Sequence, residues 1–396
     1  MFASASDGAI ITYQTLFILA LGATNAQIGL LSSLSSLSGV LILLPGALLA
    51  ERLGKRKEIA LFAGGIFGRL ILPLMILIPV LFSGSAAIYV ALALAIVRDT
   101  LNNLGLPAWI SLSADLVPLS WRGRYFGSRN FIMGVTGMIA TLLVGEIITR
   151  SGGIQGYQVT YGIAFVIGMI STYSFSRIQE PPPSALVQAD ASFSLCTIPR
   201  IFKAHPVFLT YCLTSALWNF SLNVSGPFFA PYQVNILHAT ATMVGILAIV
   251  SQISALVTQQ PLGILADRWG PRRLVVITGL LIPLLPFAWI FITDARQAIP
   301  VNLLGGALWA GYSLASFNYL LTLTPEDQRA RFSAIYQIVV ALSLSAGAAM
   351  GSLVISQWGY IAVFAVSGFG RLAAALFFAF FVRPDKVQSK ADATAE

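Results

Sequence analysis

One charged segment between two long apolar runs reads Gly263-Ile264-Leu265-Ala266-Asp267-Arg268-Trp269-Gly270-Pro271-Arg272-Arg273. An earlier segment, also between apolar runs, reads Gly46-Ala47-Leu48-Leu49-Ala50-Glu51-Arg52-Leu53-Gly54-Lys55-Arg56-Lys57. Arg52 and Arg268 lie 216 positions apart, and Gly54 and Gly270 have the same separation. A second pattern, a proline followed by two arginines, comes after each segment. It occurs at Pro118, Arg122 and Arg124 and again at Pro325, Arg329 and Arg331. Two sequence patterns that recur in the same order in each half predict a module that occurs twice.

The composition is that of a membrane protein. The chain is 57% hydrophobic and 10% charged, whereas soluble domains contain about half apolar and about a quarter charged residues. A transmembrane helix needs roughly 20 mostly apolar residues, and about a dozen such runs can be drawn here. A transmembrane barrel would instead show short segments of alternating polarity. The sequence therefore predicts an all-α polytopic membrane protein.

We expect twelve transmembrane helices in two six-helix bundles related by pseudo-two-fold symmetry. Their expected ranges are 5–22, 27–50, 59–82, 86–113, 126–149, 157–177, 206–231, 241–266, 274–293, 298–322, 332–355 and 360–382. The first bundle would span 1–178 and the second 205–384, with a polar linker at 179–204 and a polar tail at 385–396. Because Met1 almost coincides with the start of the first helix, either this helix is short or the sequence begins late within it, and we expect the latter.

The positive charges predict the orientation in the membrane. With both termini in the cytoplasm, the cytoplasmic segments carry eighteen Lys and Arg residues, and the outer loops carry only Arg150 and Arg296. This matches the known enrichment of cytoplasmic loops in Lys and Arg. The short loops and tails favour a bacterial cytoplasmic (inner) membrane. Because the basic residues lie in short loops beside membrane helices, the net charge of +8 does not indicate a nucleic-acid partner.

No pattern in the sequence indicates an enzyme or a cofactor. Cys196 and Cys212 have no metal-binding spacing, and His205 and His238 lie far apart. The sequence contains no H-E-x-x-H zinc motif, no G-x-S-x-G nucleophile motif and no phosphate-binding glycine loop. We therefore expect no catalytic residue, no metal site and no cofactor, and an ATP-driven pump is excluded on the same ground.

The repeated segment resembles the signature of the major facilitator superfamily, G-x-x-x-D/E-R-x-G-R/K-R/K, found between the second and third helices. In the first copy Ala47 stands at the glycine position and Gly46 lies one residue early, and in the second copy Pro271 intrudes. The resemblance implies a monomeric secondary transporter in which this motif closes the cytoplasmic side. The residues expected in the gating motif are Gly46, Glu51, Arg52, Gly54, Lys55, Arg56, Gly263, Asp267, Arg268, Gly270 and Arg272, with Arg122 and Arg124 before the fifth helix.

The acid of each copy is expected to act as a clasp between the two halves. Glu51 would face the positive N-terminal end of the eleventh helix, and Asp267 would face that of the fifth helix. The motif glycine would let the second helix of each bundle approach a helix of the other half. The alternative is that these charges only set the topology.

Ionisable groups at membrane depth mark the expected transport site, because they are costly there. Arg69, Arg98, Asp99 and Arg371 qualify. Arg98 would lie roughly 18 Å into its helix, near the midplane, at about 1.5 Å per residue. Asp99 could pair with Arg69, or it could bind and release a proton in each cycle, since burial favours the neutral carboxyl. Arg371 has no evident acidic partner and could reach the interface or bond to backbone carbonyls.

The resemblance also implies which helices line the cavity: the first, fourth, seventh and tenth, with the third, sixth, ninth and twelfth facing lipid. Polar and aromatic residues on the lining helices are the candidates for substrate binding: Tyr13, Gln14, Arg98, Asn102, Trp218, Asn219, Asn223, Trp309 and Tyr312. Such a lining suits a small polar or amphipathic organic molecule. Packing and hydrogen bonding between helices are the alternative roles.

The predicted function is secondary active transport of a small organic solute by alternating access, in contact with membrane lipid and with protons as a candidate coupling ion. A proton-coupled drug or metabolite efflux pump is one alternative, although the helix at 126–149 lacks the G-P-x-x-G-G-like signature of drug/proton antiporters. A channel, a lipid-handling protein and a ligand sensor are further alternatives on the same scaffold.

Overall fold

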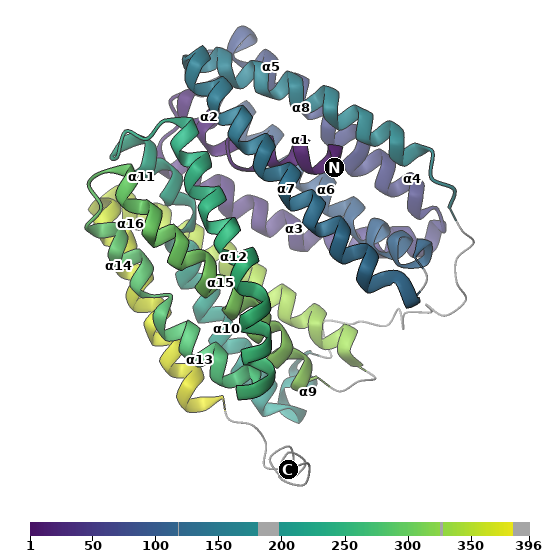
Figure 1. Ribbon diagram of the computed structural model, residues 1–396, viewed down its shortest axis with the longest axis vertical. Helices are drawn as coiled ribbons and strands as arrows, with labels where there is room; N and C mark the ends of the chain where they lie inside the picture. The colour runs from purple at the N-terminus through teal and green to yellow at the C-terminus, as the bar shows by residue number, and fades with distance from the viewer. Residues whose placement is uncertain (118, 181–197, 325–327, 383–396) are drawn as a thin grey trace. The chain divides into compact units, whose positions relative to one another are not determined.

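The computed structural model describes residues 1–117, 119–180, 198–324 and 328–382 (Figure 1). Every regular element in these ranges is a helix. The elements up to residue 180 are α1 (Phe2–Ile11), α2 (Gln14–Ala20), α3 (Asn25–Leu53), α4 (Arg56–Ala60), the π-helix η1 (Leu61–Phe67), α5 (Gly68–Leu81), α6 (Gly84–Leu116), α7 (Leu119–Ser151) and α8 (Gly153–Ser176). The later elements are α9 (Ile198–Ala204), α10 (Pro206–Ser225), the 3₁₀-helix η3 (Gly226–Phe228), α11 (Phe229–Asn235), α12 (Ala241–Trp269), α13 (Pro271–Leu281), α14 (Leu284–Ile290), the 3₁₀-helix η4 (Ala295–Gln297), α15 (Ala298–Thr322) and α16 (Arg329–Phe381).

The predicted twelve-span architecture is confirmed, although several spans are interrupted. The first expected span is divided into α1 and α2, and the seventh consists of α10, η3 and α11. The last two expected spans are joined in α16, which is kinked at Gly359, where φ is 76°. Among the described residues, nine uninterrupted stretches are long and apolar enough to cross a membrane, and the one at Arg331–Phe381 contains two spans.

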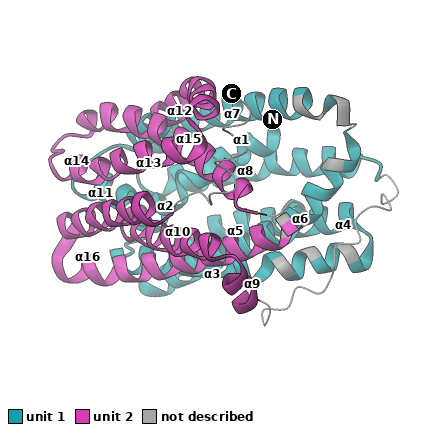
Figure 2. Ribbon diagram, turned by 90° about the horizontal axis from the view of Figure 1, so that it is seen from below, with its two compact units in different colours: residues 1–188, 227–249 teal, residues 189–226, 250–396 magenta. Residues whose placement is uncertain are grey.

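The chain divides into two compact units, coloured separately in Figure 2. Unit 1 comprises residues 1–188 and 227–249, and unit 2 comprises residues 189–226 and 250–396. This division differs from the predicted bundle boundary at 205, because α11 and the start of α12 cluster with unit 1. Residues 181–197 of the predicted linker and the predicted tail at 385–396 lie outside the described residues. The predicted domain boundaries therefore stay predictions.

Unit 1 is held together by close packing around α1 and α2. In Figure 1, α1 lies along α7 and α8, and α3 lies along α6. Phe17 is fully buried, and its ring meets that of Tyr161 edge-on at a centroid distance of 5.1 Å. Because lipid is as apolar as the core, such helices associate through van der Waals packing and hydrogen bonds rather than through the hydrophobic effect.

Unit 2 is built around the pairing of α10 with α16. Phe208 of α10 and Phe332 of α16 are both almost completely buried, and their ring centroids lie 4.6 Å apart. Further along the pair, Tyr211 stacks on Tyr336 at 5.5 Å with an interplanar angle of 12°. This aromatic seam fixes the register of the two helices.

Gly306 gives a sharp test of the packing in unit 2. A Cβ at Gly306 of α15 would lie 2.8 Å from the carbonyl carbon of Ser251 in α12, which is backbone and cannot rotate away. A Cβ on the neighbouring Gly305 would meet only a methyl group of Leu285, at 3.5 Å. We expect Gly306→Ala to destabilise the protein by about 1–3 kcal/mol through overpacking. Gly305→Ala should be neutral or stabilising by up to about 1 kcal/mol through helix propensity. Thermal unfolding of both variants in detergent would measure the difference, and equal melting temperatures would contradict this packing.

Candidate functional site

Both motif turns place a glycine at positive φ, but they differ in ψ, which is 9° at Gly54 and 146° at Gly270. Gly54 ends α3 with φ 63°, and Gly270 precedes α13 with φ 80°. Both values lie in the left-handed region that glycine adopts at little cost. Lys55 is exposed after the first turn and pairs with Glu58 at 3.1 Å, while Arg52 lies exposed in the last turn of α3.

The motif glycines Gly46 and Gly263 pack within their own unit, and the expectation that they face the other half stays a prediction. A Cβ on Gly46 of α3 would lie 2.6 Å from the carbonyl oxygen of Leu104 in α6. A Cβ on Gly263 of α12 would contact Leu314 of α15 at 3.5 Å. In both cases the neighbour is the fourth helix of the same repeat. The small residue therefore serves helix packing inside each repeat.

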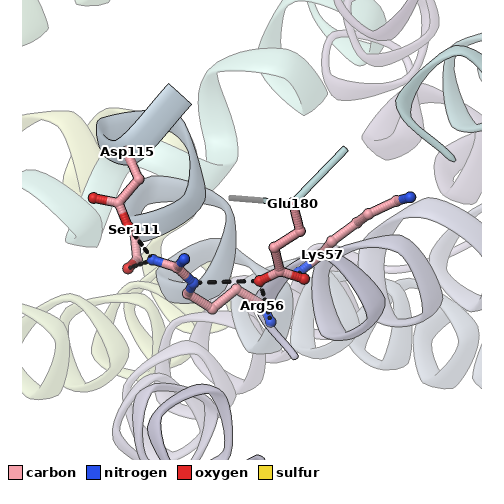
Figure 3. A network of polar contacts seen from close by, with 5 residues as sticks. All are labelled: Arg56, Lys57, Ser111, Asp115 and Glu180. Carbon is pink, nitrogen blue, oxygen red and sulfur yellow. Dashed lines mark hydrogen bonds and ion pairs between the residues drawn. The ribbon is translucent and has the colours of Figure 1, made fainter. Parts of the chain in front are cut away.

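Arg56 is the centre of a buried polar network (Figure 3). Its guanidinium pairs with Asp115 and donates to the hydroxyl of Ser111 at 3.1 Å, both on α6. Its Nε lies 3.3 Å from Glu180, which follows α8. Glu180 also accepts the backbone N–H groups of Arg56 and Lys57, at 3.1 and 3.3 Å. One arginine thus joins the starts or ends of three helices at the expected cytoplasmic side of unit 1.

Arg272 occupies the equivalent position in unit 2, 216 residues after Arg56. Its guanidinium donates to the carbonyl of Val382 through Nε and to that of Ala379 through Nη2, each at 2.8 Å. A cation at the carbonyl end of a helix is favourable because of the helix dipole. In unit 1 the motif arginine therefore binds the segment that follows the last helix of its repeat, and in unit 2 it binds the end of that helix.

The contacts of the other motif residues do not test the predicted clasps between the two halves, which stay predictions. The side chains of Glu51 and Arg122 lie outside the part of the chain that the structure describes. Asp267 and Arg268 are exposed in the last turn of α12. Arg124 lies over the ring of Trp121 at 5.8 Å on α7.

Unit 1 contains a cavity of about 420 Å³ bounded by α1, α6, α8 and the α4–η1–α5 span. This corrects the expectation that the third and sixth spans only face lipid, because η1, α5 and α8 contribute part of the wall. The glycines Gly64, Gly65 and Gly68 leave room on that side. Local π-helical geometry of the kind seen in η1 is frequent at functional sites.

An ion pair between Arg98 and Asp7 forms one wall of the cavity. Nη2 of Arg98 lies 3.3 Å from Oδ1 of Asp7. The Arg98 side chain is 8% exposed, whereas that of Asp7 is 49% exposed and so remains accessible from the cavity. The sequence analysis identified Arg98 as a site residue but did not identify Asp7. The missed signal was that a buried arginine at membrane depth calls for a carboxylate on a neighbouring helix.

Arg69 and Asp99 also line the cavity, but they do not form the pair that we predicted. Arg69 donates to the carbonyl of Gly168 and to the hydroxyl of Thr172, both on α8. Arg69 also lies within electrostatic range of Asp7 and Arg98, and Asp99 lies within range of Arg98. Because the residues of α8 beside Arg69 have short side chains, Arg69 can lie across that helix instead of reaching α6. The charge cluster therefore contains two arginines and two aspartates.

The part of the cavity wall nearest the C-terminal end of α6 is polar and aromatic. Asn102 follows Arg98 by one turn of α6, and its amide oxygen lies over Gly64 and Gly68 of the facing span. Trp109 continues the same face of α6, and Arg129 of α7 lies over its ring at 4.6 Å. Amides, an aromatic ring and charges are groups that can orient a small organic ligand.

Tyr13 belongs to the packing of unit 1 and not to the cavity wall. It is 2% exposed, and its hydroxyl donates to the carbonyl of Thr141 in α7 at 2.8 Å. Gln14 starts α2 and is half-buried. Helix α1 lines the cavity with Ala3, Ser6, Asp7 and Ile11 instead, and Asp7 is the charged residue among them.

Unit 2 brings three predicted aromatic residues together. Trp218 of α10 stacks on Tyr312 of α15 at a centroid distance of 4.5 Å, and Trp309 meets both rings edge-on. The adjoining cavity of about 10 Å³ has room for no more than a water molecule. Asn219 donates to Ser215 of its own helix, and Asn223 donates to the carbonyl of Leu344 in α16 at 2.7 Å. The cluster is closely packed here.

Arg371 of α16 is 2% exposed and donates to the carbonyl of Leu222 and the hydroxyl of Ser225. The alternative in which it bonds to backbone carbonyls is therefore confirmed.

Comparisons with known proteins agree on one family. A sequence model described as Major Facilitator Superfamily matches the chain over residues 1–233 and again over 212–396. The multidrug resistance protein MdtG of Serratia proteamaculans is 24% identical over 368 residues, which cover 90% of this chain and 85% of that protein. The multi-drug resistance efflux pump PmrA of Streptococcus pneumoniae is 26% identical over 383 residues, which cover 91% and 88%.

Solved structures agree in fold. A D-xylose-proton symporter superposes with a TM-score of 0.72 at 15% identity, covering 96% of this chain and 94% of that one. The nucleoside transporter NupG superposes with a TM-score of 0.69 at 12% identity, covering 97% of each chain. At these identities the likeness shows the fold alone.

Proposed function

The chain belongs to the Major Facilitator Superfamily and is a secondary transporter, and on that premise we propose that its solute and a proton share the Asp7–Arg98 pair. The family consists of transporters, so the chain is an integral membrane protein and not an enzyme. The observation that carries the proposal is the ion pair of a half-exposed carboxylate and a buried guanidinium on the wall of the unit 1 cavity.

The pair can exchange partners because only one of its members is buried. Protonation of Asp7 would cancel the charge that holds Arg98, and Arg98 could then bind a polar or anionic group of the solute. Loss of the proton would restore the ion pair and release the solute. Because the guanidinium of Arg98 would bind either Asp7 or the solute, protonation of Asp7 and solute binding would be coupled. Such mutual dependence is the requirement for secondary active transport.

We propose a small polar or amphipathic organic solute. The cavity volume of about 420 Å³ lies within the range of about 300–1,000 Å³ typical of small-molecule sites. Asn102 and Trp109 provide a hydrogen-bonding group and an aromatic face on the same wall as Arg98. A drug or metabolite exporter is the second candidate, favoured by the sequence likeness to MdtG and PmrA along nine-tenths of the chain.

We also propose that the protein works as a monomer in the lipid of a bacterial cytoplasmic membrane, with both termini in the cytoplasm. The distribution of Lys and Arg over the loops supports this orientation. Labelling of single cysteines introduced at Lys55 and Arg296 would test it, because only the latter should react with an impermeant reagent added outside.

Transport by purified protein in vesicles tests the proposed function. We expect at least one compound in a panel of polar metabolites and amphipathic dyes to accumulate when a pH gradient is imposed, and a protonophore to abolish the accumulation. Uptake should saturate, since each cycle occupies one site. Saturable exchange that ignores the pH gradient would contradict proton coupling, and non-saturable flux would favour a channel.

A further inference from the structure

The seventh span is interrupted in its second half. Helix α10 ends at Ser225, the 3₁₀ turn η3 covers Gly226–Phe228, and α11 begins at Phe229. Pro227 explains the break, because proline has no N–H to bond the carbonyl four residues earlier and its ring collides with that carbonyl. The division of the chain into compact units passes through the same point, since Gly226 ends one segment of unit 2 and Pro227 begins one of unit 1.

Arg371 holds the last turn of α10. Its Nη2 donates to the Ser225 hydroxyl at 2.8 Å and to the carbonyl of Leu222 at 3.4 Å. The Ser225 hydroxyl donates in turn to the Ser367 hydroxyl at 2.9 Å. The Ser367 hydroxyl donates to the carbonyl of Ser221 at 2.6 Å. Both Ser367 and Arg371 lie one turn apart in the second half of α16. All of these residues belong to unit 2.

The charge of Arg371 requires an explanation beyond packing. A charged residue in the middle of a membrane helix is costly, and Arg371 is 2% exposed. Among the described residues it forms no ion pair within 4 Å, and its Nε has no hydrogen-bond partner. What it faces is the carbonyl end of α10, which carries the equivalent of about half a negative charge. A neutral side chain could make the same hydrogen bonds but could not balance this partial charge.

We propose that Arg371 is a positioning residue for transport, which stabilises the carbonyl end of α10 and so keeps the seventh span divided at Pro227. The break separates α10, which is anchored on α16, from α11, which packs against α2. A divided span can change the direction of α11 during the transport cycle without moving α10. A continuous helix would couple the two pieces rigidly.

Hydrogen–deuterium exchange on the purified full chain in detergent tests this role without knowledge of the solute. In Arg371→Gln, the amides of residues 222–228 should exchange about tenfold faster or more, the effect of losing about 1.4 kcal/mol of local stability. Exchange over residues 206–215 and the melting temperature should stay unchanged, because replacing a buried charge by a neutral group is often neutral in stability. Arg371→Lys keeps the charge and should restore slow exchange.

Pro227→Ala provides an independent variant. It restores the missing N–H, so exchange at residues 226–229 should become slower than in the wild type. Unchanged exchange at 222–228 in Arg371→Gln would overturn the proposal. So would a general rise in exchange with a lower melting temperature, which indicates a purely structural role, or failure of Arg371→Lys to restore the wild-type pattern.

Discussion

Arg56→Ala is expected to be the most destabilising single substitution in the motif. It would leave Asp115 and Glu180 without their shared partner, with side chains only 19% and 23% exposed. Removing one partner of a fully buried ion pair lowers the free energy of unfolding by about 3–5 kcal/mol. Because these carboxylates are partly exposed, we expect a loss of about 2 kcal/mol. By the scaling for soluble domains, the melting temperature should fall by roughly 4–8 °C. Thermal unfolding in detergent would measure it.

Lys55→Ala is the matched control for Arg56→Ala. Lys55 is the neighbouring motif cation, and its pair with Glu58 is 61% and 53% exposed. Exposed pairs contribute little, so we expect a loss below about 0.5 kcal/mol. Similar losses in the two variants would mean that Arg56 acts only as a topology charge. A larger loss in Lys55→Ala would contradict the network in Figure 3.

Asp7→Asn is expected to abolish proton-driven accumulation of the solute. Asparagine keeps the size of the side chain and one acceptor for Arg98, but it cannot bind and release a proton. Uphill accumulation in vesicles should fall by at least about tenfold, equivalent to about 1.4 kcal/mol of lost driving force. Glu146→Gln is the matched control, since Glu146 pairs with Arg150 outside the cavity and is 44% exposed. That variant should accumulate solute as the wild type does.

The fold could be predicted almost completely from the sequence, because its signals are long and redundant. The apolar runs, the 216-residue offset of Arg52 and Arg268, and the positive charges of the loops all point to the same twelve spans. Interruptions within spans were harder to predict, because their cause is local. Pro227 breaks a helix, whereas Pro45 and Pro107 lie inside continuous helices, and tertiary packing decides between these outcomes.

The candidate site was predicted in part. Arg98, Asn102, Arg69 and Asp99 were identified by the cost of polar groups in the membrane, and all four line one cavity. Their partners could not be deduced, because a pairing depends on how far each side chain reaches and on the size of its neighbours. Arg69 turns to α8 where Gly168 leaves space. Asp7 was not predicted as a site residue, because the hydropathy of the first span does not show that Arg98 of another helix faces it.

Tyr13 shows why a binding role is difficult to predict from spacing alone. Its position on a lining helix suggested a role in binding, yet its hydroxyl is satisfied by Thr141. Amphipathic aromatic residues serve packing and binding with the same chemistry, so spacing alone does not separate the two roles. The distinction needs the neighbouring helices in three dimensions.

The most direct measurement is the ratio of proton-driven accumulation to solute exchange in the same vesicles. Exchange needs the solute site and the conformational change but no net proton movement, so Asp7→Asn should keep exchange within about threefold of the wild type. Accumulation in the same preparation should be lost. An Asp7→Asn protein that still concentrates its solute with the pH dependence of the wild type would contradict the assignment of coupling to the Asp7–Arg98 pair.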